Sequence, residues 1–366
     1  MKAAQRVLFL SKYARSGASS RYRSFQYLPF LEQAGLDYKV SPLFDDAYLA
    51  NRYRRGSGSM MDIVRACLCR IGALVKVRDY GLVVIEYELL PYFPALLERW
   101  LKWMGVSYVV DYDDALFHQY DRHRNPLIRW LLGGKIAVVM RYAEVVVAGN
   151  SYLADYARKA GAKRVEVIPT VIDLERYPIA DLKKEGGAVT IGWIGSPTTA
   201  KYLQIIAPAL AEICKNRKAK LRLIGSGAIK LPGVDVEVLP WSEVSEVELM
   251  HTFDIGIMPL PDESWARGKC GFKLIQYMAC GLPVIASPVG VNSEIVEHGI
   301  NGFLASTQDE WIDALKRLIV DAALRGRMGR YGRSRVGQQY CLQVIAPKLI
   351  GLLSDVARGK ESGSVR

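Results

Sequence analysis

The stretch SWARGKCGFKLIQYMACGLPVIASPVGVNSEIVEHGINGFLA, residues 264–305, constrains the fold more than any other part of the chain. It begins with a glycine-rich turn at residues 268–271, and apolar residues at helical spacing then predict a helix over residues 272–280. Gly281 ends this helix, and residues 284–286 predict a short buried strand. Helix and strand alternate again over the remainder, a pattern typical of an α/β domain.

A glycine turn that leads into a helix N-terminus can bind an anion. Backbone N–H groups in the first turn lack helical partners, and the helix dipole adds about half a positive charge. Lys273 would add a full charge one turn into the helix. We therefore predict a bound phosphate at Gly271, Phe272 and Lys273. The alternative is a lysine whose stem lies along an ordinary α/β loop.

The same succession of strand, glycine loop and helix occurs elsewhere in the chain. Residues 6–10 predict a buried strand, a loop around Gly17 follows, and a helix is expected from Arg21 to about Ala34. A strand predicted at residues 189–193 leads into another glycine loop and helix. No GxGxxG motif is present, which disfavours a dinucleotide-dependent dehydrogenase.

The length of 366 residues, half of them hydrophobic, suits two domains of ordinary size. We predict a first domain at residues 1–178 and a second at residues 179–345, each a doubly wound α/β sheet. A C-terminal helix and tail occupy residues 346–366, and the polar segment 181–187 is the expected linker.

Composition and charge limit the kinds of partner that the chain is expected to bind. The net charge of +12 favours acidic ligands or an anionic surface, but no nucleic-acid-binding motif or basic–aromatic platform accompanies it. The six cysteines lack CxxC and zinc-ligand spacing, so we expect reduced thiols in a cytoplasmic protein, with no metal and no cofactor. The N-terminal apolar run is too short for a signal peptide, and no stretch is long enough for a transmembrane helix.

The segment RYRRGSGSMMDIVRACLCRIGALVKVRDY, residues 52–80, alternates arginine and lysine with large apolar residues. It predicts a basic amphipathic helix preceded by an arginine-rich glycine/serine loop. Such a helix can lie peripherally on an anionic membrane, or it can be a core helix with one solvated face. The sequence leaves both interpretations open.

Acidic residues follow two further predicted strands. Glu88 follows a strand at residues 82–86, and a strand at residues 106–110 ends in Asp111-Tyr112-Asp113-Asp114. Ligands of open α/β sheets bind at the carboxyl ends of strands, and clustered carboxylates are costly unless something uses them. The cluster could be a metal site of Asp111 with Asp113, a substrate-contacting site, or a helix N-cap at Asp113 or Asp114. We favour the substrate-contacting site, because the predicted anion site lies in the other half.

The segment GFKLIQYMACGLPVIASPVGVNSEIV resembles the C-terminal signature of retaining glycosyltransferases of family 4. Two more segments, VVAGNSYLADYARKAGAKRVEVIPTVIDLERYP and GWIGSPTTAKYL, are similar to the same family. The resemblance implies the GT-B fold, in which two Rossmann-like domains face a central cleft. It also implies that the helix after Gly271 holds the diphosphate of a nucleotide sugar. Two glutamates that flank this helix in the family are replaced here by Gly268 and Gln276, although Gln276 can still bond a ribose hydroxyl.

The resemblance assigns further roles, residue by residue. Family members often have a His–Asp pair at the end of the strand predicted at residues 106–110, and those positions hold Asp113 and Asp114. We predict these two and Glu88 as catalytic residues. Lys201 and Lys273 would neutralise the leaving diphosphate. The predicted donor-binding residues are Gly195, Ser196, Lys201, Trp241, Gly271, Phe272, Lys273 and Gln276, and the predicted acceptor contacts are Gly17, Arg21 and Arg23.

The expected function is metal-independent transfer of a sugar, with retention, from a UDP- or GDP-sugar to a saccharide or lipid-linked acceptor. Bacterial surface polysaccharide or lipid-linked glycan synthesis is the process that the resemblance implies. The missing glutamates motivate one alternative, a catalytically inactive nucleotide-sugar-binding or scaffold protein. A sugar-nucleotide epimerase of the same fold is the other.

Overall fold

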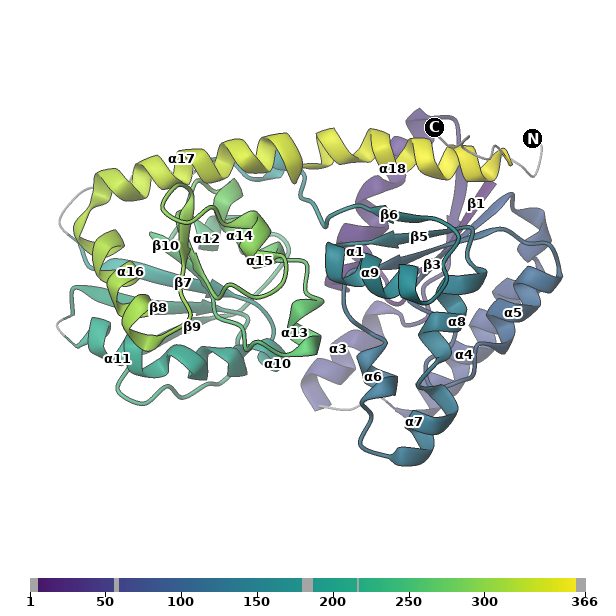
Figure 1. The fold of residues 1–366 in the computed structure, drawn as a ribbon, viewed down its shortest axis with the longest axis horizontal. Coiled ribbons are helices and arrows are strands. Elements are labelled where there is room, and N and C mark those ends of the chain that lie inside the picture. The colour runs from purple at the N-terminus through teal and green to yellow at the C-terminus, as the bar shows by residue number, and fades with distance from the viewer. Residues whose placement is uncertain (1–5, 56–58, 180–186, 216, 360–366) are drawn as a thin grey trace. The chain divides into compact units, whose positions relative to one another are not determined.

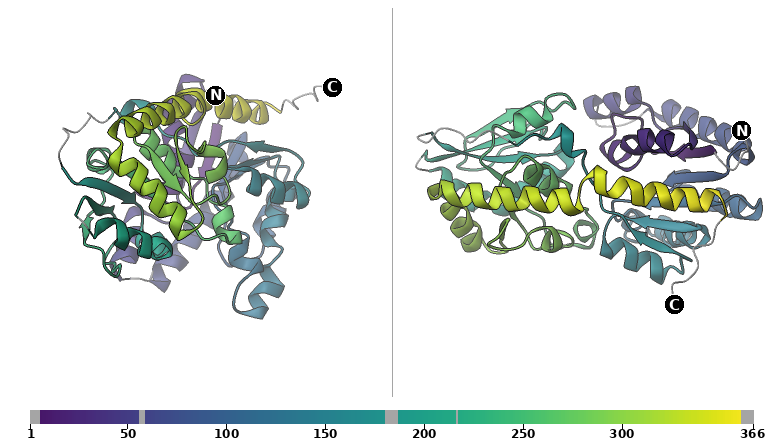
Figure 2. Two further views of the ribbon diagram at one scale, coloured as in Figure 1. Left: turned by 60° about the vertical axis from the view of Figure 1, so that its left-hand side comes forward. Right: turned by 90° about the horizontal axis from the view of Figure 1, so that it is seen from above.

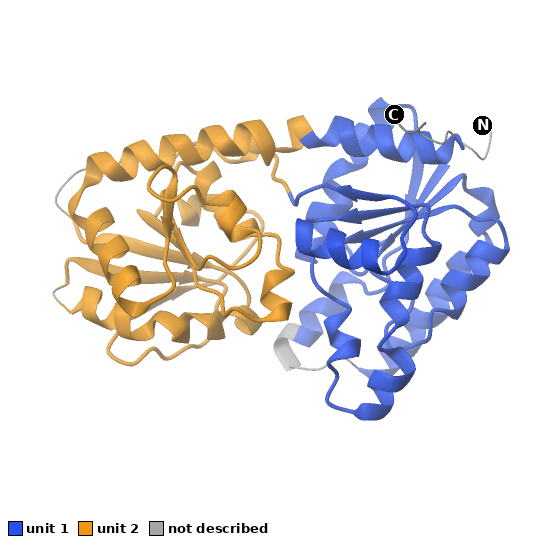
Figure 3. Cartoon of the chain, in the orientation of Figure 1, with its two compact units in different colours: residues 1–170, 345–366 blue, residues 171–344 orange. Residues whose placement is uncertain are grey.

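The computed structural model describes residues 6–55, 59–179, 187–215 and 217–359, which form two compact units (Figure 3). The first unit runs to Thr170 and takes in the chain again from Ile345, and the second spans Val171–Val344. Residues 171–178 thus lie in the second unit, and the domain limits drawn from the sequence stay a prediction. The expected linker lies outside the described residues except for Gly187.

The first unit is built on six parallel strands in the order β2-β1-β3-β4-β5-β6, of which β1, β3, β5 and β6 are labelled in Figure 1. The strands are β1 Arg6–Leu10, β2 Asp37–Val40, β3 Leu82–Glu86, β4 Tyr108–Tyr112, β5 Val145–Ala148 and β6 Val165–Val167. Strands β3, β4 and β5 are buried at every residue, as expected of parallel strands covered on both faces. The strand order reverses between β1 and β3, and doubly wound sheets bind ligands at such a point.

Helices and 3-10 turns connect these strands. They are α1 Ala18–Arg23, η2 Phe25–Tyr27, α2 Leu28–Gln33, α3 Asp46–Arg55, α4 Met60–Val75, η3 Val77–Asp79, α5 Leu96–Trp103, α6 His118–Asp121, α7 Pro126–Leu132, α8 Lys135–Tyr142 and α9 Ser151–Lys159. The single helix expected over residues 21–34 is wrong. It is interrupted because Pro29 has no N–H to donate to the carbonyl of Phe25. Residues 52–55, expected in a loop, belong to α3.

The second unit has six parallel strands in the order β12-β11-β10-β7-β8-β9. The strands are β7 Val189–Ile194, β8 Ala219–Ile224, β9 Val236–Leu239, β10 Ile255–Met258, β11 Val284–Ala286 and β12 Gly302–Leu304. This is the order of a dinucleotide-type Rossmann sheet, with its switch point between β7 and β10. The predicted strand at residues 284–286 is confirmed as β11.

The connections of the second unit place loops and helix starts at the carboxyl ends of its strands. The elements are η4 Leu174–Arg176, α10 Pro197–Ala200, η5 Lys201–Ile206, α11 Ala207–Cys214, α12 Glu246–Met250, α13 Ser264–Arg267, α14 Phe272–Ala279, α15 Asn292–Ile295, α16 Gln308–Val320 and α17 Ala322–Gln339. The helix predicted over residues 272–280 is confirmed as α14. Trp193 and Trp311 are buried in the core that covers one face of this sheet.

Helix α18, Leu342–Ala357, begins in the second unit and continues into the first. Its residues from Ile345 onward belong to the first unit, where both views of Figure 2 show the yellow helix. Lys348 donates to the carbonyl of Val167 in β6 at 3.5 Å. Among the described residues, no helix has the length and apolar character needed to cross a membrane.

Candidate functional site

A glycine loop after β7 lets a lysine from α14 cross the end of the sheet. A Cβ atom at Gly195 would lie 2.6 Å from Cη2 of Trp193 and 2.8 Å from Cε of Lys273. The Lys273 stem therefore passes directly over Gly195, where any side chain would collide with it. The Lys273 ammonium lies 5.3 Å from the Trp193 ring centroid, within range of a cation–π contact.

A second glycine loop, after β8, closes on the first. Gly225 has φ +73, and a Cβ there would lie 2.5 Å from the carbonyl oxygen of Gly195 and 3.0 Å from Cβ of Trp241. Both the left-handed backbone and the close approach require glycine at this position. The structure thus brings together Gly195, Trp241 and Lys273, three predicted donor-binding residues that are far apart in the sequence.

Helix α14 begins at this cluster. Its N-cap, Gly271, has φ +63, and a Cβ there would lie 2.4 Å from Cδ1 of Ile295. Phe272 and Lys273 are half-buried, whereas every residue from Leu274 to Cys280 is buried. The first turn of the helix therefore meets the glycine loops with its positive dipole end and a lysine. This arrangement is chemically suited to bind a phosphate or diphosphate.

Gln276 lies deeper in the same helix and belongs to a buried hydrogen-bond chain. Its Nε2 donates to the Tyr177 hydroxyl at 3.1 Å, and that hydroxyl donates to Oε1 of Glu246 at 2.9 Å. Trp241 donates from Nε1 to the other oxygen of Glu246, also at 2.9 Å. Tyr177 thus takes one N–H of the Gln276 amide, and a ribose contact would use the second N–H or the amide oxygen. The chain also fixes the indole of Trp241, which is 38% exposed.

The remaining predicted donor residues lie along the loop after β7. Ser196 is the N-cap of α10, and its hydroxyl lies 2.8 Å from that of Thr198. Lys201 begins η5 and is exposed, with its ammonium 5.5 Å from the ring centroid of Tyr202. Its paired role with Lys273 stays a prediction.

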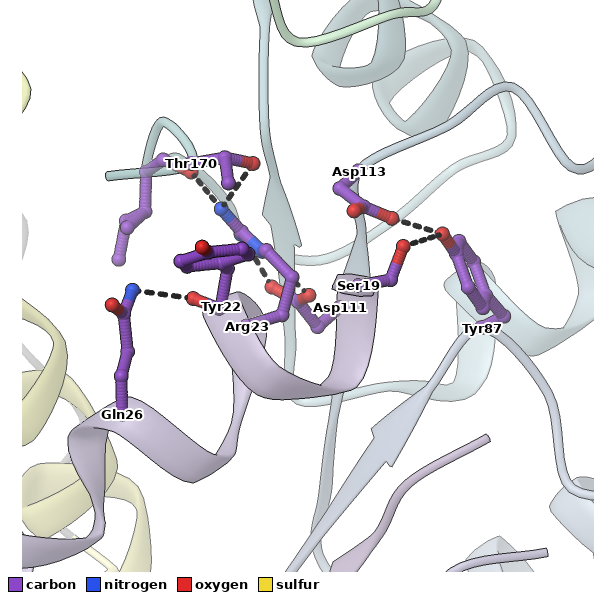
Figure 4. A network of polar contacts seen from close by, with 9 residues as sticks. Ser19, Tyr22, Arg23, Gln26, Tyr87, Asp111, Asp113 and Thr170 are labelled. Carbon is purple, nitrogen blue, oxygen red and sulfur yellow. Dashed lines mark hydrogen bonds and ion pairs between the residues drawn. The ribbon is translucent and has the colours of Figure 1, made fainter. Parts of the chain in front are cut away.

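In the first unit, polar side chains gather at the carboxyl ends of β1, β3 and β4 (Figure 4). The Tyr87 hydroxyl donates to Oδ1 of the half-buried Asp113 and lies 3.3 Å from the Ser19 hydroxyl of α1. Tyr87 has φ +63 immediately after β3, a conformation that is uncommon for a residue with a side chain and is often found at functional sites. The Lys12 ammonium lies 5.1 Å from the Tyr87 ring centroid.

Glu86, the last residue of β3, lies at the switch point beside this group. Its Oε2 accepts hydrogen bonds from the Ser20 hydroxyl at 2.6 Å and from the backbone N–H of Lys12 at 2.9 Å. Its Oε1 is buried and has no partner among the described residues. Burial raises the pKa of Glu86 to about 7, while the two hydrogen bonds oppose this rise. Glu86 can therefore exchange a proton near neutral pH.

This raised pKa predicts a pH-dependent stability. The folded chain holds a proton that the unfolded chain releases between the ordinary pKa of 4.5 and about 7, so Glu86 lowers stability as pH rises through that window. Glu86→Gln removes this titration. We expect its stability relative to wild type to rise by about 3 kcal/mol from pH 4.5 to pH 7.5. Urea denaturation across that range measures the difference, and a constant difference would contradict the assigned pKa.

Arg23 and Asp111 form a buried bidentate ion pair (Figure 4). Arg23 donates from Nε and Nη2 to the two Asp111 oxygens at 2.8 and 2.6 Å, and from Nη1 to the Ile168 carbonyl at 2.9 Å. Its guanidinium is thus engaged within the first unit, and an acceptor contact through Arg23 stays a prediction. Because both Asp111 oxygens face Arg23, the pairing disfavours the metal interpretation of Asp111 with Asp113.

The N-cap interpretation of Asp113 and Asp114 is wrong, because the next helix, α6, starts at His118 with Phe117 as its N-cap. Strand β4 also ends later than expected, so Asp111 lies within it. Asp113 and Asp114 are both half-buried in the loop that follows.

Glu88 is held in a buried ion pair. One of its oxygens lies 2.5 Å from the Lys135 ammonium, and both oxygens accept from the Tyr120 hydroxyl at 2.8 Å. Lys135 also donates to the Leu90 carbonyl at 2.6 Å. These contacts fix the chain just after Tyr87. Glu88 can therefore position the segment that carries Tyr87.

Gly17 and Arg21 both belong to the start of α1. Gly17 is its N-cap, and a Cβ there would lie 2.4 Å from Cβ of Tyr13. Arg21 is buried, with its guanidinium carbon 4.8 Å from the Tyr22 ring centroid. Gly17 thus allows the loop after β1 to fold closely onto α1.

Several residues of the polar group around Asp113 and of the glycine-loop cluster around Lys273 were not identified from the sequence. They are Glu86, Tyr87 and Ser20 in the first unit, and Tyr177, Gly225 and Glu246 in the second. Glu86 ends an apolar strand and Gly225 follows one, so their positions at strand ends could have identified both. Tyr177 and Glu246 carry no such signal, since their contact depends on tertiary packing.

Comparison with known proteins agrees with this architecture. A family model described as glycosyl transferases group 1 matches residues 188–321. The N-acetyl-alpha-D-glucosaminyl L-malate synthase of Bacillus anthracis is 27% identical over 221 residues, covering 56% of this chain and 57% of that protein. Anabaena HepE, solved with UDP and glucose, superposes with a TM-score of 0.66 at 18% identity, over 96% of this chain and 100% of that one.

WaaG, described as a glycosyltransferase involved in lipopolysaccharide biosynthesis, has a TM-score of 0.68 at 15% identity, over 95% of this chain and 99% of that one. The chain spans about half the length of the curated relatives it matches. The likeness to solved structures extends over nearly the whole chain and shows the fold, while the family model rests on the unit that contains the Gly195–Lys273 cluster. Residues 188–321 thus match the group 1 glycosyl transferases, and the chain has the GT-B fold.

Proposed function

We propose that this chain is a retaining glycosyltransferase that moves a sugar from a nucleotide-sugar donor to an acceptor hydroxyl. The observation that carries the proposal is the cluster of Gly195, Gly225 and Lys273 at the N-terminus of α14. There, two glycine loops leave room for a lysine and a helix dipole to meet a diphosphate. A diphosphate leaving group accumulates negative charge as the glycosidic bond breaks, and preorganised positive groups stabilise that charge.

The donor is a UDP- or GDP-sugar in this proposal, with UDP favoured because HepE was solved with UDP and with UDP-glucose. Lys273, helped by Lys201 and the helix N-termini, neutralises the diphosphate without a metal ion. Trp241, fixed by Glu246, offers its half-exposed indole for contact with the nucleotide base.

The first unit binds the acceptor in this proposal, and Asp113 contacts the reacting sugar or the acceptor hydroxyl. Tyr87 holds the Asp113 carboxylate in place, and Glu88 positions the segment that carries Tyr87. Asp114, next to Asp113 in the chain, has a supporting role in this proposal. The acceptor is a saccharide or lipid-linked saccharide of a bacterial surface polysaccharide, since WaaG is described as acting in lipopolysaccharide biosynthesis. A lipid-linked acceptor would bring the chain to the face of an anionic membrane.

The test is a thermal-shift and hydrolysis screen against UDP-, GDP-, ADP- and CMP-sugars without added metal. Stabilisation by one nucleotide sugar, with slow release of its UDP, GDP, ADP or CMP, supports the transferase. Binding without turnover, even with candidate acceptors present, would favour the inactive binding protein suggested by Gly268 and Gln276. Conversion of the donor into an epimer without an acceptor would favour an epimerase. The absence of any nucleotide binding would contradict the proposal.

Asp113→Asn is expected to lower turnover on the order of 100-fold while leaving the donor dissociation constant unchanged. Asparagine keeps an oxygen that can accept from Tyr87 but loses the charge that would act on the reacting groups. Steady-state kinetics combined with donor titration separates the two effects. Asp155→Asn, at a side chain 63% exposed, is the matched control and should change neither. A wild-type rate for Asp113→Asn would leave Asp113 a purely structural role.

A further inference from the structure

Helix α4 turns a stripe of large apolar side chains toward solvent. The stripe consists of Met60, Met61, Val64, Leu68, Ile71 and Val75, which are between 44% and 79% exposed. At about 100° per residue, these six positions fall within an arc of about 100° on one side of the helix. We call these residues the α4 stripe. A contiguous apolar face of this size on a soluble domain commonly marks an interaction surface.

The opposite side of α4 is already anchored. Ala66, Arg70 and Leu74 are buried, and Arg70 donates from Nη2 to the carbonyl of Ser11 at the end of β1, at 2.6 Å. The helix cannot roll its stripe inward without breaking this hydrogen bond and exposing those residues. The stripe is therefore an outward face of the folded unit, held by contacts that reach the switch point of the sheet.

The charge of the first unit matches an anionic surface. Residues 1–170 and 345–366 contain 29 Lys and Arg against 18 Asp and Glu, a net charge of +11. Residues 171–344 contain 20 against 19, a net charge of +1. Arg65 and Lys76 are exposed on α4 and just after it, and at helical spacing both fall on the same side of the stripe.

We propose that the α4 stripe inserts into the interface of an anionic phospholipid bilayer, with Arg65 and Lys76 at the lipid phosphates. Apolar burial and attraction of cations to anionic lipids together drive this mode of binding. A second copy of the chain fits the stripe less well, because pairing would bring together two first units that each carry a net charge of +11. The inference rests on the proposed function, in which the acceptor is lipid-linked. It deepens that function by naming the surface that contacts the membrane.

Vesicle cosedimentation with the full chain, without donor, tests the proposal. Wild type should bind vesicles of equal phosphatidylcholine and phosphatidylglycerol more tightly than phosphatidylcholine alone, and added salt should weaken the binding. Leu68→Glu combined with Ile71→Glu should weaken it about tenfold or more. The matched control is Val244→Glu with Val320→Glu in the second unit, at positions 94% and 81% exposed, and it should bind like wild type.

Equal binding by the Leu68→Glu/Ile71→Glu variant, or no binding by wild type, would overturn the proposal. A wild-type dimer that this variant dissociates, with no vesicle binding, would assign the stripe to a second copy instead. Circular dichroism melting establishes that each variant is folded without relying on donor binding. The vesicle assay is run without donor, so its result does not depend on nucleotide binding. Failure of the nucleotide-sugar screen would refute the proposed function without changing what the vesicle result says about the α4 stripe.

Discussion

Replacing Lys273 with methionine is expected to weaken UDP binding roughly 10- to 100-fold. A charge-assisted contact with a phosphate typically contributes about 1.5–3 kcal/mol, and this variant removes the ammonium group while keeping most of the stem. Methionine keeps an unbranched chain over Gly195 and beside Trp193, so the packing of the two glycine loops should survive. Isothermal titration with UDP measures the loss, and a melting curve of the unliganded variant checks that the fold is intact.

Two comparisons sharpen this experiment. Uridine lacks phosphates, so its affinity should be the same for wild type and Lys273→Met if the lysine acts on the diphosphate. Lys273→Ala also removes the stem that passes over Gly195, so it should lose some stability in addition to affinity. Unchanged UDP affinity in Lys273→Met would show that the diphosphate does not bind at the N-terminus of α14. The proposed function would then lose its main support.

The α/β architecture was predictable because apolar runs and glycine turns are local signals. The helix and strand predicted at residues 272–280 and 284–286 match α14 and β11. Each unit repeats strand, loop and helix, and such a sequence has few alternatives to a parallel sheet. The helix expected over residues 21–34 is interrupted for an equally local reason, since Pro29 has no N–H to continue it.

The orientation of α4 was not predictable from its composition. Its pattern allows either a core helix or a surface helix, and tertiary contacts decide between them. Arg70 faces inward because the Ser11 carbonyl offers it an acceptor, while Leu68 and Ile71 face solvent. Hydrophobicity alone would predict an exposed Arg70 and buried Leu68 and Ile71.

The closeness of Gly195 and Lys273 could largely be expected from the sequence, and the group around Glu86 and Asp113 only in part. Glycine turns and Lys273 stand out in a sequence, whereas Glu86 reads as the last residue of an apolar strand. Its burial, and the closeness of Lys12 and Ser20, depend on which strands are neighbours. Arg23 reads as a basic residue at a helix start, and only the pairing of its guanidinium with Asp111 shows that it is part of the interior.

Replacing Arg23 with alanine is expected to destabilise the first unit by about 3–5 kcal/mol, because it leaves the Asp111 carboxylate buried without its partner. Burial raises the pKa of Asp111, and the Arg23 charge opposes this rise. Without Arg23 the carboxyl should take up a proton more readily, so the loss of stability should be smaller at pH 5 than at pH 8. Urea denaturation at the two pH values measures both the size and the pH dependence.

The chain provides a matched control of the same chemistry. Arg158 and Asp155 form an ion pair at 2.8 Å on α9 of the same unit, but their side chains are 56% and 63% exposed. Arg158→Ala should cost at most about 1 kcal/mol, because water replaces the lost contact. Replacing both Arg23 and Asp111 with leucine should recover much of the stability, since no buried charge is then left unpaired. Equal losses of stability for Arg23→Ala and Arg158→Ala would show that burial does not determine how much the Arg23–Asp111 pair contributes to stability.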